Sequence, residues 1–81
     1  MDRARVMEEV QEIFRDNFDD DSIVLTDATT AADIEDWDSL EQINLLTAME
    51  RKYGLKFNLS DVRNLANIGD MVDLLERLGV Q

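Results

Sequence analysis

The chain has 81 residues, which suits one small domain that buries about 60% of its unfolded surface and leaves little room for a deep catalytic cavity. Its 19 acidic and 8 basic residues give a net charge of −11, which disfavours binding to nucleic acid or anionic membranes and attracts basic protein surfaces. Cysteine and histidine are absent, which excludes disulfide bonds, the usual zinc sites and Cys–His or Ser–His catalysis.

The remaining composition favours helices. Hydrophobic residues make up 44% of the chain and charged residues 33%, as in an ordinary small helical protein. There is no proline and there are only three glycines, which disfavours an architecture with many turns. No signal peptide or long apolar stretch follows the first residues, so we expect a cytoplasmic protein without a membrane span.

A first amphipathic helix is predicted from Arg3 to about Phe18, with Asp2 as its N-cap. Its apolar positions recur every three or four residues and form one stripe. The members of this stripe are Val6, Val10, Ile13, Phe14 and Phe18.

Residues 19–36 show no sustained period and are predicted to form a long loop, with a turn of helix near residues 29–32. A loop of this length is usually functional or held by its own side chains. The expected anchors are apolar, namely Ile23, Leu25, Ile34 and Trp37. The run of three aspartates at residues 19–21 lacks the glycine of an EF-hand, so we interpret it as a solvated loop that leaves room for loose cation binding but forms no defined metal site.

A second helix is predicted from Asp38 or Ser39 to about Tyr53. Gly54 suits the left-handed position that ends a helix, and two basic residues in the last turn complement the helix dipole. Apolar residues at spacings of three and four are expected to form one continuous buried stripe. This stripe consists of Leu40, Ile43, Leu46, Met49 and Tyr53.

The last third of the chain is predicted to hold an extended connector and two further helices. In residues 55–59, Phe57 should plug the core together with either Leu55 or Leu59. Ser60 should cap a short helix, and a last helix should follow Asp70 and end at Gly79. The predicted fold is therefore all-α. It is a small four-helix bundle of three main helices and one short helix, with a long first loop, in a single domain spanning residues 1–81.

The segment Asp38-Ser39-Leu40-Glu41 opens the second helix and has two interpretations. In the first it is an ordinary capping box, in which Asp38 accepts a backbone N–H and Glu41 reaches back. In the second, Ser39 displays its hydroxyl at the positive end of the helix dipole, where a phosphate ester is favoured. The chain has no histidine to act as a base, so another enzyme would have to modify Ser39.

Residues from Ile23 to Leu78 resemble the acyl carrier proteins. Three segments carry the resemblance: Asp38-Ser39-Leu40 matches the attachment motif, residues 50–55 are similar to the exit from the second helix, and residues 67–75 are similar to the start of the last helix. The order of helices, the length and the charge agree with it. The rival hypothesis, from another class, is an unmodified small acidic helical module that binds a basic protein.

The resemblance implies a carrier and not an enzyme. A phosphopantetheinyl transferase, with its own magnesium ion, would attach 4′-phosphopantetheine to Ser39. The thiol of this arm would then hold an acyl or aminoacyl group as a thioester. The implied partners are a loading enzyme and a downstream synthase or transferase of fatty acid, polyketide or related biosynthesis, and the carrier is expected to be a monomer. The residues implied to line a space for an acyl chain are Leu46, Val62, Leu65 and Ile68.

Partner recognition is expected around the attachment motif and along the second helix. The implied residues are Trp37, Asp38, Leu40, Glu41, Asn44 and Glu50. This helix is less acidic than is usual in the family, and Trp37 resembles the residue found in discrete carriers of dedicated pathways rather than in general fatty-acid carriers. Tryptophan is common at interface hot spots, but packing of Trp37 between the loop and the second helix is the favoured interpretation.

Overall fold

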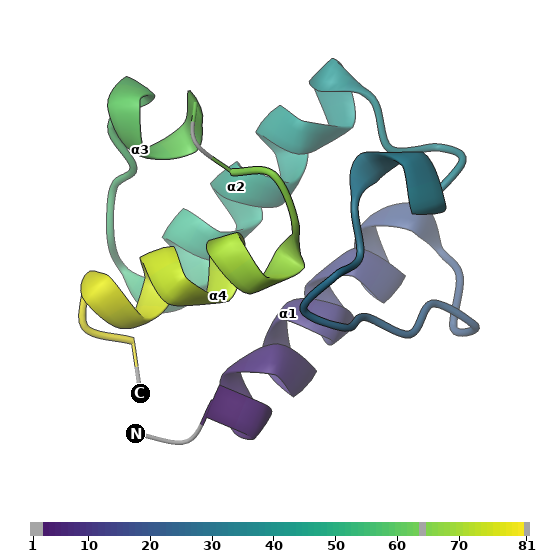
Figure 1. Ribbon diagram of the computed structural model, residues 1–81, viewed down its shortest axis with the longest axis horizontal. Helices are drawn as coiled ribbons and strands as arrows, with labels where there is room; N and C mark the ends of the chain where they lie inside the picture. The colour runs from purple at the N-terminus through teal and green to yellow at the C-terminus, as the bar shows by residue number, and fades with distance from the viewer. Residues whose placement is uncertain (1–2, 64, 81) are drawn as a thin grey trace.

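The computed structural model describes residues 3–63 and 65–80, and within these ranges it contains four α-helices and no strand (Figure 1). The helices are α1 (Arg3–Phe18), α2 (Ser39–Tyr53), α3 (Leu59–Arg63) and α4 (Ile68–Arg77). A short 3-10 turn, η1 (Ala31–Asp33), interrupts the loop between α1 and α2. The all-α prediction is confirmed. Asp2, the predicted N-cap of the first helix, lies outside the described residues.

Three helices form the core, because α1 packs against both α2 and α4. Each contributes apolar side chains that are fully shielded from solvent, at the spacings of three and four that define one helix face. These side chains include Val6, Val10, Phe14, Leu45, Met49, Ile68, Val72 and Leu75. Helix α3 has no buried residue and lies on the side of the molecule away from α1 (Figure 1).

The predicted buried stripe of α2 is wrong at its first two positions. Leu40 and Ile43 are 65% and 61% exposed, whereas Leu45 and Met49 are fully buried. The reason is helical geometry: each step of three residues falls about 60° short of a full turn, so three such steps lead to the opposite face of the helix. The spacing of four from Leu45 to Met49 stays on the face that packs into the core against α1.

The ends of the other elements differ slightly from the predictions. Helix α3 begins at Leu59, one residue before the predicted cap Ser60, and the backbone of Asp61 bonds to Asn58 O at 3.1 Å. Helix α4 begins at Ile68 rather than after Asp70, because the Asn67 side chain caps it by accepting the Asp70 N–H at 2.8 Å. In the connector, Leu55 and Phe57 pack against the core while Leu59 is 66% exposed. Of the two predicted pairs, Leu55 with Phe57 is therefore confirmed.

The loop between α1 and α2 is anchored by the four predicted apolar residues, of which Leu25 is buried and the others are partly buried against the core. Two backbone hydrogen bonds then fix this loop to the start of α4. The Ile68 N–H donates to Thr29 O at 2.8 Å, and the Gly69 N–H donates to Asp27 O at 2.9 Å. The loop and α4 therefore form one connected wall.

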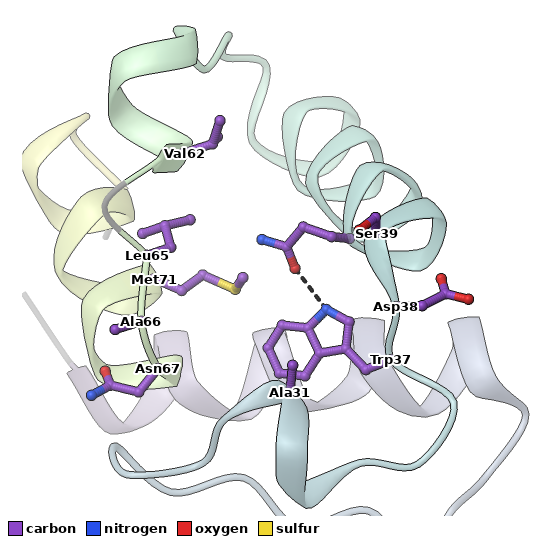
Figure 2. Close-up of a pocket in the computed structure, with 10 residues that line it drawn as sticks. Ala31, Trp37, Asp38, Ser39, Val62, Leu65, Ala66, Asn67 and Met71 are labelled. Carbon is purple, nitrogen blue, oxygen red and sulfur yellow. Dashed lines mark hydrogen bonds between the residues drawn. The ribbon is translucent and has the colours of Figure 1, made fainter.

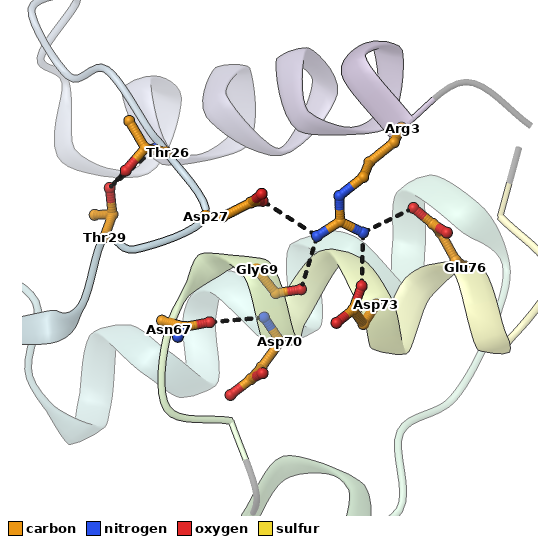
Figure 3. A network of polar contacts seen from close by, with 9 residues as sticks. All are labelled: Arg3, Thr26, Asp27, Thr29, Asn67, Gly69, Asp70, Asp73 and Glu76. Carbon is orange, nitrogen blue, oxygen red and sulfur yellow. Dashed lines mark hydrogen bonds and ion pairs between the residues drawn. The ribbon is translucent and has the colours of Figure 1, made fainter.

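Arg3 reinforces the same junction (Figure 3). Its guanidinium lies 3.1 Å from Asp27, 2.6 Å from Asp73 and 3.0 Å from Glu76, and it also donates to Gly69 O at 3.3 Å. The hydrogen bonds to these carboxylates raise the pKa of Arg3. One cation thus joins α1, the loop and α4. In the part of the chain that the structure describes, no helix is long and apolar enough to cross a membrane.

Candidate functional site

The site begins at the N-terminus of α2. Asp38 is the N-cap, and its Oδ1 accepts the Glu41 N–H at 2.9 Å while its backbone oxygen accepts the Gln42 N–H at 2.9 Å. Ser39 is the first residue of the helix and its side chain is exposed. The N–H groups of Ser39 and Leu40 lie in the first turn, where they have no helical acceptor, so this end of α2 favours a negatively charged group.

The predicted capping box at this helix is only half formed. Asp38 caps α2 as expected, but Glu41 does not reach back to the backbone of Asp38. Its Oε1 accepts instead from Asn17 Nδ2 at 3.0 Å and from Asn44 Nδ2 at 3.1 Å. Glu41 therefore ties the first turn of α2 to the last turn of α1, a long-range contact that local spacing cannot reveal.

A cleft of about 470 Å³ opens beside Ser39, between the start of α2 and the segment that joins α3 to α4 (Figure 2). This size lies within the range of about 300–1,000 Å³ that is typical of small-molecule sites. Its walls are mainly apolar. The lining residues are Ala31, Trp37, Asp38, Ser39, Gln42, Val62, Leu65, Ala66, Asn67 and Met71.

Trp37 forms one wall of this cleft (Figure 2). Its indole N–H donates to Gln42 Oε1 at 2.7 Å. Its ring packs edge-on against the buried ring of Phe14, with centroids 5.0 Å apart and an interplanar angle of 85°. The predicted packing of Trp37 between loop and helix is confirmed, with the indole N–H satisfied as a half-buried tryptophan requires.

The structure brings together only part of the predicted site. Val62 and Leu65 line the cleft with Ser39, whereas Leu46 and Ile68 are absent from its lining. Ile68 is fully buried at the start of α4, where it belongs to the core. Five lining residues were not predicted from the sequence, namely Ala31, Gln42, Ala66, Asn67 and Met71. Gln42 could have been found, because residues three apart share a helix face.

The predicted recognition residues differ in the solvent exposure of their side chains. Leu40 and Asn44 are exposed next to the motif. Glu50 accepts the Phe57 N–H at 2.8 Å, a contact that holds the connector after α2. Glu50 is thus engaged within the chain, and the open surface lies at the first turns of α2.

The arrangement around Ser39 consists of a helix cap, an exposed hydroxyl and an apolar cleft. The neighbouring carboxylate of Asp38 is used as a helix cap, and no group of three or more metal-ligating side chains was found in residues 3–63 and 65–80. An exposed hydroxyl beside an apolar cleft can be modified by another enzyme, and the chain contains no histidine to act as its base.

Comparison with known proteins identifies the family. A family model described as a phosphopantetheine attachment site matches residues 4–75. Among solved structures, the chain is similar to the solution NMR structure of the holo acyl carrier protein of Geobacter metallireducens. The identity is 46%, the match covers 89% of this chain and 83% of that chain, and the TM-score is 0.85. No curated protein matched significantly.

The chain belongs to the acyl carrier protein family. It is a carrier and not an enzyme, and its prosthetic group is a covalently attached 4′-phosphopantetheine. The residues present fit such a group: an exposed hydroxyl, a helix end that favours a phosphate, and an apolar cleft of small-molecule size lie side by side. These findings favour the carrier over the unmodified interaction module.

Proposed function

We propose that Ser39 is the residue to which the 4′-phosphopantetheine arm is attached. The supporting observation is its position as the exposed first residue of α2, on the lip of the cleft. The other serines, Ser22 and Ser60, are also exposed but do not line this cleft. Ser39 alone therefore combines an accessible hydroxyl with the positive end of a long helix and an adjoining apolar space.

The prosthetic group, when attached, supplies a thiol that holds an acyl or aminoacyl group as a thioester. The chain's residues do the rest. Asp38 fixes the first turn of α2, so that the amides of Ser39 and Leu40 remain directed at the phosphate ester. Val62 and Leu65, together with Met71, offer apolar surface to a bound chain. Leu46 and Ile68 have no part in this surface, because Ile68 belongs to the core and Leu46 packs against it.

The partners follow from this role. A phosphopantetheinyl transferase attaches the arm, a loading enzyme charges it, and a downstream synthase or transferase takes the cargo. Their contact surface is the start of α2, where the exposed Leu40 and Asn44 adjoin the motif and where Trp37, Asp38 and Glu41 hold its shape, while Glu50 holds the connector at the far end of this helix. We assign the chain to a monomeric, cytoplasmic carrier of a dedicated pathway, with residues 1–81 as one carrier domain.

Intact mass tests the attachment. The protein is incubated with coenzyme A, magnesium and a broad-specificity phosphopantetheinyl transferase, and its mass is measured before and after. We expect the wild type to gain one phosphopantetheine and the Ser39→Ala variant to gain none. Ser60→Ala is the matched control, because Ser60 is also an exposed serine in the first turn of a helix, and this variant should gain the full group.

A gain in Ser39→Ala, or a loss in Ser60→Ala, would contradict the assignment to Ser39. Circular dichroism of both variants, compared with the wild type, shows whether a variant that gains no mass is still folded. An unmodified but folded wild type would instead contradict the attachment itself.

A further inference from the structure

Gln42 lies beside the proposed attachment residue and has no part in the role described so far. It is three residues after Ser39 in α2, which places the two side chains on one helix face, with their Cβ atoms about 5–6 Å apart. Both residues line the cleft. A group attached to Ser39 therefore passes close to the carboxamide of Gln42 if it enters the cleft.

The orientation of this carboxamide is fixed by chemistry. The indole nitrogen of Trp37 can only donate, so the Gln42 atom 2.7 Å away from it must be the oxygen. The amide nitrogen therefore points away from the indole. Within the described part of the chain, no hydrogen bond uses this nitrogen. Gln42 thus offers N–H donors to whatever occupies the cleft.

The support of this carboxamide is rigid. Trp37 is held by its edge-on contact with Phe14, whose side chain is fully buried between the helices. The donor is consequently oriented before any ligand arrives, which lowers the entropy lost on binding.

The rest of the cleft makes the donor distinctive. Facing Trp37 are the apolar side chains of Val62, Leu65 and Met71 (Figure 2). The Asn67 oxygen caps α4 and the Asn67 amide nitrogen points away from Trp37 (Figure 2), whereas the Asp38 carboxylate can only accept hydrogen bonds. A carbonyl oxygen that leaves water for this cleft needs a donor to offset its desolvation, and Gln42 is placed to supply one.

We propose that Gln42 is a positioning residue for the carrier's arm. Its amide N–H donates to a carbonyl oxygen of the 4′-phosphopantetheine arm or of the attached cargo, and this bond keeps the arm along the cleft instead of free in solvent. Trp37 acts through Gln42 by fixing its orientation. The proposal rests on attachment at Ser39. The amide carbonyls of the arm and the carbonyl of an acyl group share the required chemistry, and the experiment separates them.

Side-chain amide signals in ¹H–¹⁵N NMR spectra test the bond directly. Spectra are recorded of the unmodified protein, of the protein bearing the arm alone, and of the protein bearing an octanoyl arm, with intact mass confirming each state. We expect the Gln42 side-chain signal to shift on modification and the Gln11 signal to stay in place. Gln11 is a matched internal control, because its oxygen also accepts a hydrogen bond, from the Leu25 N–H at 3.0 Å, but it lies outside the cleft.

A shift with the arm alone assigns the bond to an arm carbonyl, and a shift only with the octanoyl arm assigns it to the cargo. Either result supports the proposal. If the Gln42 signal shifts no more than that of Gln11 in both modified states, the proposal is overturned.

Two variants separate the donor from the support of Trp37. Gln42→Glu keeps an acceptor for the indole but removes the donor, whereas Gln42→Leu removes both. Trp37 is the sole tryptophan, so the quenching of its fluorescence by acrylamide reports on this wall of the cleft. We expect modification to reduce quenching in the wild type and in Gln11→Glu, which adds the same charge elsewhere, but in neither Gln42 variant.

Protection of Trp37 in modified Gln42→Glu equal to that in the wild type would overturn the role of the donor. The two proposals fail in different ways. Absence of the mass gain at Ser39 overturns both, whereas a full mass gain without the spectroscopic changes overturns only the role of Gln42.

Discussion

Tyr53 illustrates how a single residue joins two helices. It stands at the end of α2 and donates its hydroxyl to Glu9 Oε1 in α1 at 2.8 Å. Burial raises the pKa of Tyr53 well above its ordinary value, and the hydrogen bond and charge of Glu9 raise it further. The folded state therefore favours the neutral phenol. This stabilisation is complete below the ordinary tyrosine pKa of about 10 and is lost as the pH rises toward the higher folded value.

Tyr53→Phe should lower the free energy of unfolding at neutral pH by about 1 kcal/mol, because the hydrogen bond to Glu9 is lost. Above pH ~10 the wild type should lose more stability than the variant, since only the wild type has a phenol to ionise. Urea unfolding at neutral and alkaline pH measures both effects. Tyr53 is the sole tyrosine, so tyrosinate absorbance reports its ionisation directly. Equal alkaline losses in the two proteins would contradict this account.

Gly69 shows where a missing side chain matters. A Cβ atom at this position would lie 3.0 Å from Asp27 O and 3.1 Å from Asp27 Cβ. The glycine therefore permits the backbone contact that fixes the loop to α4.

Gly69→Ala should be destabilising although alanine is the better helix former. Helix propensity favours alanine by about 1 kcal/mol, whereas overpacking against a fixed backbone costs about 1–3 kcal/mol. We expect the cost of overpacking to be the larger, because the hydrogen bond from the Gly69 N–H to Asp27 O at 2.9 Å holds the loop next to the added methyl group. A urea midpoint of Gly69→Ala at or above that of the wild type would contradict this prediction and show that the loop moves to accommodate the methyl group.

At the scale of elements, the helices were predictable and their contacts were not. The period of apolar residues and the signals at helix ends predicted the bounds of α1 and α2 closely. Gly54, for example, ends α2 in the left-handed conformation, with a φ of 65°. The face of α2 was misjudged because its apolar residues outnumber the positions facing the core, and spacing alone does not say which of them α1 covers. The cleft residues Gln42 and Met71 come from different helices, so their meeting depends on packing that no local pattern specifies.

The corrected face of α2 predicts unequal costs of substitution. Leu45→Ala should lower the free energy of unfolding by about 2–5 kcal/mol, because it leaves a cavity in the core. Ile43→Ala, which removes a 61% exposed side chain, should change it by less than about 0.5 kcal/mol. Urea unfolding of both variants provides the measurement. Similar losses at the two positions would restore the stripe predicted from the sequence.

For the whole molecule, the excess of negative charge is an unfavourable contribution to stability. The net charge of −11 makes the compact state repel itself, and salt screens such repulsion. We expect the melting temperature to rise with salt or with divalent cations. The melting temperature of Arg3→Met should respond more strongly to salt than that of the wild type, since the substitution leaves three carboxylates close together without their cation. Arg51→Met has the same net charge and serves as control, because Arg51 is exposed and belongs to none of the ion pairs of the described residues.

A melting temperature that stays constant between low and moderate ionic strength would contradict the repulsion argument. Equal salt responses in the two arginine variants would show that the Arg3 cluster contributes no more than its single charge.

The lack of buried residues in α3 has a mechanical consequence. One side of the cleft is stiff, since α2 is packed on α1 and the loop is bonded to α4. The part of the other side that α3 forms, at Val62, is compliant: α3 spans five residues, buries none of them, and is joined to α4 by an ion pair between Asp61 and Arg77 at 3.7 Å. Displacing α3 breaks few apolar contacts and costs little free energy. We therefore expect the end of the cleft beside Val62 to adjust to the bulk of its contents while the three-helix core keeps its shape.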